Sequence, residues 1–226
     1  MMALVFIFIF LLAACSPVTE SDSDSSTQST AAQGSNVVDT TDMPVCLQNE
    51  SKIEHWLVKK ELFPELSETY SSKTSESPVT FELRTPKSYS IVNSSNYYSY
   101  NFHFWNKDRK DSLRPILMLS VVGKQKNQKR QDPIWKCLKA AIYSIHKSKS
   151  ENWKQSPVEA GKIDGITFVR QYWSGTEKSP QGKLKVSGFV YVGSIGETLI
   201  IGLSTDKDTK AVELAEASLQ SFQLVR

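Results

Sequence analysis

The chain has 226 residues with 27 basic and 24 acidic side chains, a net charge of +3. Residues 1–51 hold six of the acids and no base, so residues 52–226 hold 18 acids and all 27 bases, a net charge of +9. A folded part of about 180 residues has room for one hydrophobic core but not for two, which excludes two large domains. Its positive charge indicates a solvated basic surface that attracts anionic material, or a specific site for an anionic ligand.

An apolar stretch over residues 3–12 leads into Leu12-Ala13-Ala14-Cys15. A stretch of ten residues is too short to cross about 30 Å of hydrocarbon, which takes roughly 20, and is typical of a cleaved leader. The run resembles the lipobox of bacterial lipoprotein precursors. That resemblance implies that residues 1–14 are a signal peptide and that Cys15 carries a diacylglyceryl group, whose two acyl chains anchor a protein stably. No Lys or Arg precedes Lys52, so plain secretory cleavage and a buried N-terminal core helix stay open.

Residues 15–45 are rich in Ser, Thr, Asp and Gln and contain few large apolar side chains. Such a segment cannot bury enough surface to offset the entropy lost on ordering, which predicts a disordered tether. A flexible coil of roughly 30 residues has ends on the order of 30 Å apart, enough to hold a domain clear of lipid headgroups. The single folded domain is expected over residues 46–226.

The domain begins with a pattern that favours a helix. Ser51 and Glu54 have capping-box spacing, and Ile53, Trp56 and Leu57 then recur at helical intervals before Pro64. These signals predict a helix over residues 51–64.

Two short strands are predicted next, over residues 79–83 and 88–92. The sequence Thr85-Pro86 lies between them and favours a turn, because proline keeps the preceding residue out of the helical region. We expect these two strands to pair with each other.

Two stronger strand patterns follow. Over residues 97–105, apolar side chains alternate with polar ones, so one face is expected in the core. The apolar row is Tyr98, Tyr100, Phe102 and Phe104, and the polar row is Ser99, Asn101 and His103. Residues 115–122 are almost continuously apolar, which predicts a central strand covered on both faces.

The next loop concentrates positive charge in Lys124, Lys126, Lys129 and Arg130. No aromatic residue lies among them to stack on a base, so we expect no nucleic-acid partner. A solvated loop is one interpretation. Contact with an acidic protein partner or an anionic glycan of the envelope is the other.

The second half of the chain predicts a helix, three strands and a last helix. Pro133 opens the first helix, and the strands cover residues 165–173, 183–192 and 197–204, separated by turns rich in Gly. An amphipathic helix is predicted over residues 209–222. The order of these elements indicates an α+β fold with an antiparallel sheet.

Two cysteines remain once Cys15 is assigned to lipid. Cys46 lies at the edge of the tether and Cys137 in a predicted helix, and an even pair in an exported chain predicts a disulfide. The bridge would close a loop of about 90 residues and stabilise the fold by at most about 4 to 5 kcal/mol. Two unpaired thiols are the alternative. We expect no metal site, because the histidines, His55 among them, occur singly.

Several short sequences together resemble those of PsbP-like domains. They are Leu83-Arg84-Thr85-Pro86-Lys87-Ser88-Tyr89, Ile163-Asp164-Gly165-Ile166, Thr198-Leu199-Ile200-Ile201-Gly202-Leu203-Ser204 and Leu219-Gln220-Ser221-Phe222. The likeness covers roughly residues 78–226 and rests on apolar and glycine positions, which carry no chemistry. It implies an antiparallel sheet sandwiched between helices, an α/β/α sandwich. By analogy it also implies a binding or assembly module, although fold does not fix function.

The sequence favours a non-catalytic module, anchored by lipid on Cys15, that binds or helps assemble another envelope component. It contains no nucleophile elbow, phosphate-binding loop or paired metal-ligand motif, so we expect no catalytic residue and no cofactor. The location that follows is the cell envelope, at the inner or outer membrane, facing the periplasm or the cell surface.

Two alternatives stay open at this point. A small-ligand carrier would have a pocket between sheet and helix lined by Tyr98, Tyr100 and Trp173. A hydrolase with residues dispersed along the chain would draw on titratable side chains that no motif connects. Its candidates are His103, His146, Asp164 and Glu177.

Overall fold

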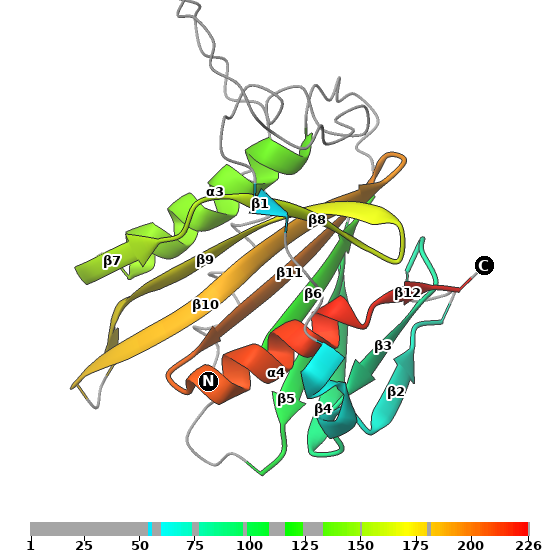
Figure 1. Ribbon diagram of the computed structural model, residues 1–226, viewed down its shortest axis with the longest axis horizontal. Helices are drawn as coiled ribbons and strands as arrows, with labels where there is room; N and C mark the ends of the chain where they lie inside the picture. Colours follow the sequence, from blue (N-terminus) through cyan, green and yellow to red (C-terminus); the bar gives the residue numbers. More distant parts are fainter. Residues whose placement is uncertain are drawn as a thin grey trace, which may run out of the picture.

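The computed structural model describes residues 54–55, 60–73, 77–96, 99–108, 116–123, 133–149, 151–179 and 182–225. Runs of consecutive strands are separated by helices along this part of the chain (Figure 1). In chain order they are β1 (Glu54–His55), the 3-10 helix η1 (Lys60–Glu65), β2 (Glu68–Ser71), β3 (Phe81–Thr85), β4 (Tyr89–Ser95), β5 (Ser99–Asn106), β6 (Leu117–Val122), α3 (Pro133–Ser148), β7 (Glu151–Gln155), β8 (Glu159–Ile163), β9 (Ile166–Ser179), β10 (Gly182–Ile195), β11 (Thr198–Asp206), α4 (Thr209–Gln220) and β12 (Gln223–Leu224).

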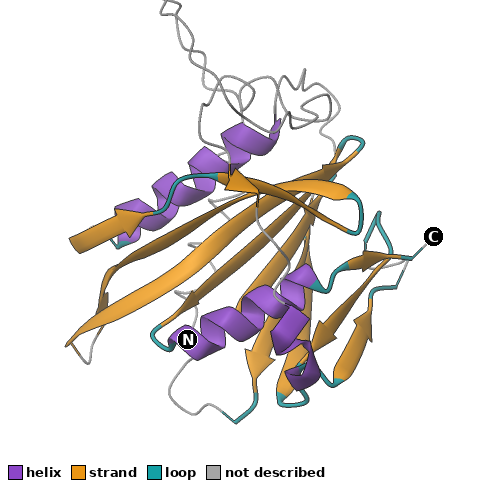
Figure 2. Ribbon diagram, in the orientation of Figure 1, coloured by secondary structure: helices purple, strands orange, loops and turns teal. Residues whose placement is uncertain are grey.

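Most of the strands form one large sheet (Figure 2). Within the described residues its strand order is β1-β8-β9-β10-β11-β6-β5-β4, and β7 pairs with the part of β9 beyond β8. All neighbours are antiparallel except β1 and β8. The two longest strands, β9 and β10, have 14 residues each and form the centre of this sheet.

Alternating side chains of the sheet enter two separate hydrophobic clusters, one for each helix. The cluster under α3, the α3 cluster, includes Met118, Leu138, Ala141, Val169, Trp173, Val190 and Ile201. The cluster under α4, the α4 cluster, includes Phe102, Phe104, Phe168, Phe189, Tyr191, Ala215, Leu219 and Phe222. Since successive side chains of a strand point to opposite faces, the two clusters lie on the two faces of the sheet.

Helix α4 approaches the sheet closely at a glycine. A Cβ atom added to Gly202 of β11 would lie 2.4 Å from Leu219 Cδ2, a distance that real Cβ atoms do not reach. The absent side chain therefore makes room for Leu219 in the α4 cluster.

A second, three-stranded sheet has the order β12-β3-β2 and brings the two halves of the chain together. The N–H of Arg84, on β3, donates to Ser221 Oγ at the end of α4 over 2.8 Å. At the other side of β12, the N–H of Leu224 donates to Asp164 Oδ2 over 2.8 Å. Three segments that are distant in sequence, β2 with β3, the turn between β8 and β9, and the end of α4 with β12, are thus held together at this end of the molecule (Figure 1).

The α+β class and the antiparallel sheet are confirmed. The predicted strands over residues 97–105, 115–122, 165–173, 183–192 and 197–204 correspond to β5, β6, β9, β10 and β11, and the helices from residue 133 and over 209–222 correspond to α3 and α4. β6 is buried at all six positions and lies between β5 and β11, as a central strand should. No helix in the described part of the chain is long and apolar enough to cross a membrane.

Two local predictions are wrong. The capping-box segment does not form a helix over residues 51–64, because Glu54–His55 pairs in parallel with β8 and Lys60–Glu65 is a 3-10 helix. Strand β8, about 100 positions later in the chain, provides backbone hydrogen-bond partners for Glu54 and His55. These tertiary contacts determine the local structure, because the helix signal of so short a segment is weak. The strands around Thr85-Pro86 do not pair with each other either, since β3 joins the small sheet and β4 joins the large one.

Candidate functional site

Strand β9 carries a charged residue into the α4 cluster. Phe168 belongs to that cluster and Tyr172 packs against it, so Arg170 between them points to the same face. Its Cα partner on β10 is Tyr191, which is fully buried, and Arg170 itself is only 7% exposed. An arginine at such a position must be paired with acids to offset its lost hydration.

Helix α4 supplies one of those acids. The side chain of Asp208 caps the helix by accepting from the Lys210 N–H over 3.0 Å. Two turns later Glu216 and Gln220, four positions apart and so on one side of the helix, are buried with 1% and 4% exposure. The sheet-facing side of α4 therefore carries a carboxylate and an amide among apolar residues.

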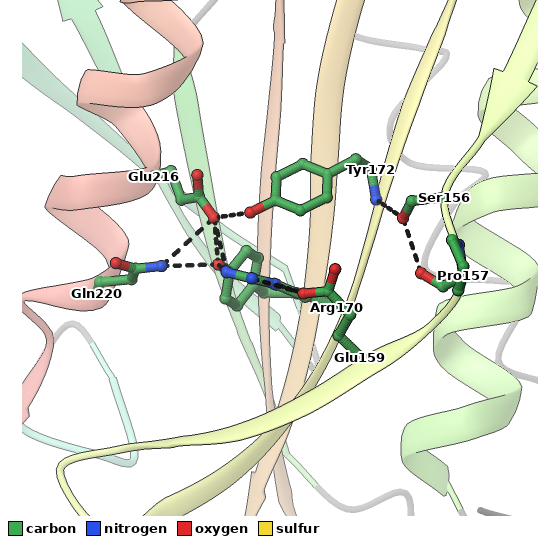
Figure 3. A network of polar contacts seen from close by, with 8 residues as sticks. Ser156, Pro157, Glu159, Arg170, Tyr172, Glu216 and Gln220 are labelled. Atoms are coloured by element: carbon green, nitrogen blue, oxygen red, sulfur yellow. Dashed lines mark hydrogen bonds and ion pairs between the residues drawn. The ribbon is translucent and has the colours of Figure 1, made fainter. Parts of the chain in front are cut away.

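These side chains form one connected set of hydrogen bonds and ion pairs (Figure 3), which we term the Arg170 network. Its members are Glu159, Arg170, Tyr172, Tyr191, Glu216 and Gln220. On the β8 side, Arg170 Nε donates to Glu159 Oε2 over 2.5 Å, and Nη2 lies 2.5 Å from the same oxygen. On the α4 side, Arg170 Nη1 lies 3.0 Å from Glu216 Oε1. The guanidinium thus links strand β8 to helix α4.

Most of the donors in the network converge on a single atom, Glu216 Oε1. The Tyr191 hydroxyl donates to it over 2.5 Å, the Tyr172 hydroxyl also donates to it, and Gln220 Nε2 lies 3.4 Å away. Tyr191 in turn accepts from Gln220 Nε2 over 3.0 Å and from Arg170 Nη1 over 2.8 Å. Charge-assisted bonds of this kind are the stronger class of protein hydrogen bond.

The tyrosines of the network stay protonated. Burial, followed by the negative charge of Glu216, raises the pKa of the Tyr172 and Tyr191 hydroxyls well above the usual value for a phenol. Both hydroxyls therefore act as donors to the carboxylate and not as bases. A carboxylate oxygen surrounded by donors, next to an arginine that does not titrate, holds elements together and is poorly placed for proton transfer.

Sequence reasoning did not identify this network, although two signals for it were present. Arg170 alternates with Phe168 and Tyr172, so it shares one face of its strand with aromatic side chains. Glu216 follows Val212 by four positions and precedes Leu219 by three, which puts it on the apolar stripe of the last helix. A charged residue on each of two adjoining apolar surfaces is the pattern of a buried ion pair.

The predicted lipidation and basic-loop residues lie outside the described residues. These are Cys15, Lys124, Lys126, Lys129 and Arg130. Of the predicted disulfide, Cys46 also lies outside them, whereas Cys137 is 4% exposed in α3, within the α3 cluster. The pairing of these two cysteines stays a prediction.

The predicted lining of a ligand pocket is wrong. Tyr100 packs against the α4 cluster, whereas Trp173 is a member of the α3 cluster, so the sheet separates them. Tyr98 lies outside the described residues. Trp173 is only 3% exposed and stacks on Trp153, with ring centroids 5.6 Å apart.

The four hydrolase candidates have separate surroundings. His103 is half-buried on β5, and burial lowers the pKa of its imidazole. The ring of His146 lies 4.9 Å from that of Trp153, and the carboxylate of Glu177 lies 3.5 Å from Lys149 Nζ. Asp164 occupies the turn between β8 and β9 and accepts from Leu224. The contacts of these residues are structural, and none is a hydrogen bond between two of the four in the described part of the chain.

No protein-family model and no curated protein matches the chain. Among the described residues, no group of three or more His, Cys, Asp or Glu side chains is arranged to hold a metal ion.

Three solved structures are similar to it at low sequence identity. A protein from Bacteroides thetaiotaomicron is 12% identical with a TM-score of 0.40, and the match covers 71% of this chain and 49% of that one. Cyanobacterial PsbP (CyanoP) from Synechocystis is 13% identical with a TM-score of 0.44, covering 70% and 92%. LpqN, described as involved in cell envelope biogenesis of Mycobacterium tuberculosis, is 14% identical with a TM-score of 0.43, covering 76% and 99%. TM-scores of this size carry no argument about function.

Proposed function

We propose that the chain is a lipid-anchored, non-catalytic module of the cell envelope whose PsbP-like domain binds or helps assemble another envelope component. The observation that carries this proposal is Leu12-Ala13-Ala14-Cys15 at the end of a ten-residue apolar stretch. Cleavage before Cys15 removes residues 1–14, and two acyl chains on the cysteine hold the mature chain in the bilayer. The segment up to residue 45 then acts as the tether.

The Arg170 network supports a binding role over a catalytic one. It links side chains from β8, β9, β10 and α4, and its central carboxylate oxygen already has several donors. Its tyrosines are held protonated by burial and by Glu216. These groups join α4 to the sheet, which gives a rigid scaffold for an interaction surface.

The charge distribution indicates which kind of partner the module binds. Residues 52–226 carry a net charge of +9, and the basic loop contributes Lys124, Lys126, Lys129 and Arg130. An acidic protein surface or an anionic glycan of the envelope would be attracted to it. A disulfide between Cys46 and Cys137 would fix the start of the domain to α3, in a compartment where thiols are oxidised.

The anchor is tested by intact-mass spectrometry of the protein extracted from envelopes. The wild-type chain is expected to begin at Cys15 and to carry added acyl mass. Cys15→Ala should lose the acyl mass, whereas Cys46→Ala, a matched control at a second cysteine, should keep it. A wild-type chain of full length, or one without acyl mass, contradicts the proposal.

The binding role is tested separately by cross-linking in intact envelopes. Replacement of the four basic loop residues by Glu is expected to reduce cross-linking to the partner at least tenfold. A matched variant, with Lys178, Lys183, Lys185 and Lys154 replaced by Glu, keeps the net charge of the first variant but leaves the loop intact. Equal loss in both variants would assign the effect to overall charge and not to the loop.

A further inference from the structure

The large sheet has two ends of very different character. At one end β1 has two residues, whereas at the other end β4 has seven, all of them paired with β5. No described strand pairs with the other side of β4. Its last four residues, from Val92 to Ser95, are exposed. Strand β4 is therefore a long edge, and Figure 1 shows it at the border of the sheet.

The backbone hydrogen bonds show which residues of β4 face outward. Asn96 N–H donates to the Ser99 carbonyl over 2.9 Å, and Lys107 N–H donates to the Ser88 carbonyl over 2.8 Å. The pairs Asn96–Ser99 and Ser88–Lys107 extend the register of β4 with β5 at its two ends, and both involve an even-numbered residue on the β4 side. The even-numbered residues of β4 therefore direct their N–H and C=O groups at β5. Because antiparallel pairs alternate, the odd-numbered residues Ile91, Asn93 and Ser95 turn their N–H and C=O groups away from β5.

Strand β4 lacks the features that usually protect an edge. Proteins blunt such strands with charged side chains, proline, a bulge or short length. The sequence Tyr-Ser-Ile-Val-Asn-Ser-Ser of β4 contains no charge and no proline, and its register with β5 is regular throughout. At its centre, Val92 is one of the exposed large hydrophobic side chains, with 55% exposure. An uncharged edge of this kind is suited to pairing with another strand.

We propose that β4 pairs antiparallel with β4 of a second copy of this chain, about a two-fold axis at Val92. Val92 is the midpoint of the seven residues, so this register gives each residue of the strand a counterpart in the other copy. Ile91 lies opposite Asn93 of the second copy and exchanges backbone hydrogen bonds with it, because both belong to the outward-facing set. The interface is isologous, the commonest kind in dimers.

The self-complementarity of β4 is what identifies a second copy as the occupant. In this register Val92 meets Val92 of the second copy as a non-hydrogen-bonded pair, in which Cα atoms are about 4.5 Å apart and side chains touch. Ser90 lies opposite Ser94 on the same face, so hydroxyls meet hydroxyls. No like charges face one another, since the strand has none. The dimer joins two large sheets into one continuous sheet.

The test is disulfide trapping with the full-length protein in its own envelope. A Val92→Cys chain is expected to give a disulfide-linked dimer on mild oxidation, because about 4.5 Å between Cα atoms suits the bond. Ser94→Cys is the matched control, equally exposed and on the same face, and should give no dimer beyond the wild-type level. Co-expressed Ser90→Cys and Ser94→Cys chains should link to each other, which fixes the register.

A second variant removes the interface without removing the strand. Asn93→Pro deletes an outward N–H and leaves the bonds of β4 to β5 in place, as edge strands allow. It also removes the exposed hydrogen bond of 3.3 Å that Asn93 Nδ2 donates to the Tyr70 hydroxyl, so Asn93→Ala, which loses that bond but keeps the backbone N–H, is the control and should keep the dimer. The dimer measured by sedimentation in detergent should weaken about tenfold or more, with one hydrogen bond lost from each copy. A Val92→Cys chain that stays monomeric, or that links to a different polypeptide, overturns the proposal. The acyl-mass test of the anchor is independent of either result.

Discussion

The two faces of the large sheet hold their helices by different means. On one face α3 is packed by aliphatic side chains and by the stacked rings of Trp153 and Trp173. On the other face α4 is packed by apolar side chains and, in addition, by the Arg170 network. Apolar packing has little directionality, whereas a carboxylate that accepts from fixed donors specifies one position of the helix. Polar contacts of fixed geometry therefore set the position of α4, whereas the position of α3 depends on apolar packing.

Such a network is a weak source of net stability. The free energy needed to remove the charges from water is about as large as the free energy gained from their attraction. Deleting one partner therefore lowers the free energy of unfolding strongly, because the other charged groups stay buried without it. The two faces should therefore respond differently to truncation. Four substitutions test this contrast.

Glu216→Ala should give the largest effect. It leaves Arg170 and two tyrosine hydroxyls without their shared acceptor, and the free energy of unfolding is expected to fall by about 4 kcal/mol. Urea denaturation followed by tryptophan fluorescence measures this quantity. Glu213→Ala, the same change on a half-buried position of α4, should stay within about 0.5 kcal/mol of wild type. Equal losses in both variants would show that helix propensity and not the network is responsible.

Leu138→Ala tests the apolar face. Leu138 is 1% exposed in the α3 cluster, and its truncation should lower the free energy of unfolding by about 3 kcal/mol through lost burial and a residual cavity. Tyr143→Ala on the same helix is the control, because Tyr143 is 67% exposed and its loss should be within about 0.5 kcal/mol. A loss at Leu138 that exceeds the loss at Glu216 would contradict the ranking of the two faces.

Tyr172→Phe removes one of several donors to Glu216 and should cost about 1 kcal/mol at neutral pH. The folded state holds the pKa of this hydroxyl above its unfolded value, so above about pH 10 the unfolded chain loses a proton that the folded chain keeps. Stability contributed by the group is thus lost as pH rises. The urea midpoint of unfolding should therefore fall less between neutral and alkaline pH in Tyr172→Phe than in wild type. An equal fall of the midpoint in both proteins would argue against the raised pKa of Tyr172.

His103→Gln should have the smallest effect, on the pH dependence alone. His103 pairs across from Met118 and so lies on the face of the α3 cluster, where burial lowers the pKa of its imidazole. As pH falls below about 6.5, the unfolded chain binds a proton before the folded chain does, so stability decreases. The variant should lose part of that acid decline, measured as the urea midpoint between pH 7 and 5. Exposed His146→Gln serves as the control and should keep it.

The sequence predicted those elements whose pattern reflects their own burial. β5 and α3 show clear periodicity because each has one face against a cluster, whereas β10 is recognised by its apolar run because it lies between both clusters. β7 and β8 were not predicted, because Glu-Asn-Trp-Lys-Gln and Glu-Ala-Gly-Lys-Ile have little alternation and are held by pairing with β9. The predicted helix near Glu54 failed for the same reason, since its backbone pairs with a strand over 100 positions away.

The Arg170 network could not be derived from spacing, because its members come from β8, β9, β10 and α4. Arg170 and Glu216 each lie on an apolar face of their own element, but only the fold, with the register that sets Arg170 opposite Tyr191, brings them together. Register depends on the whole set of strand pairings. The proposed lipobox, by contrast, is a contiguous sequence that resembles a known motif, so it can be proposed without a structure.

The pairing of β12 with β3 has a consequence for how the chain folds. Residues at the very end of the described chain complete a sheet begun in its first half, and the Arg84–Ser221 bond joins positions 137 apart. Contacts of such long range make folding slow, because loop closure must precede most of the gain from the contacts. The small sheet and its link to α4 cannot form until residues 221–224 have been synthesised. Until β12 is synthesised, the side of β3 that it will pair with stays without a strand partner, so a chain that emerges from its N-terminus exposes this edge of the small sheet for most of its synthesis from β3 onward.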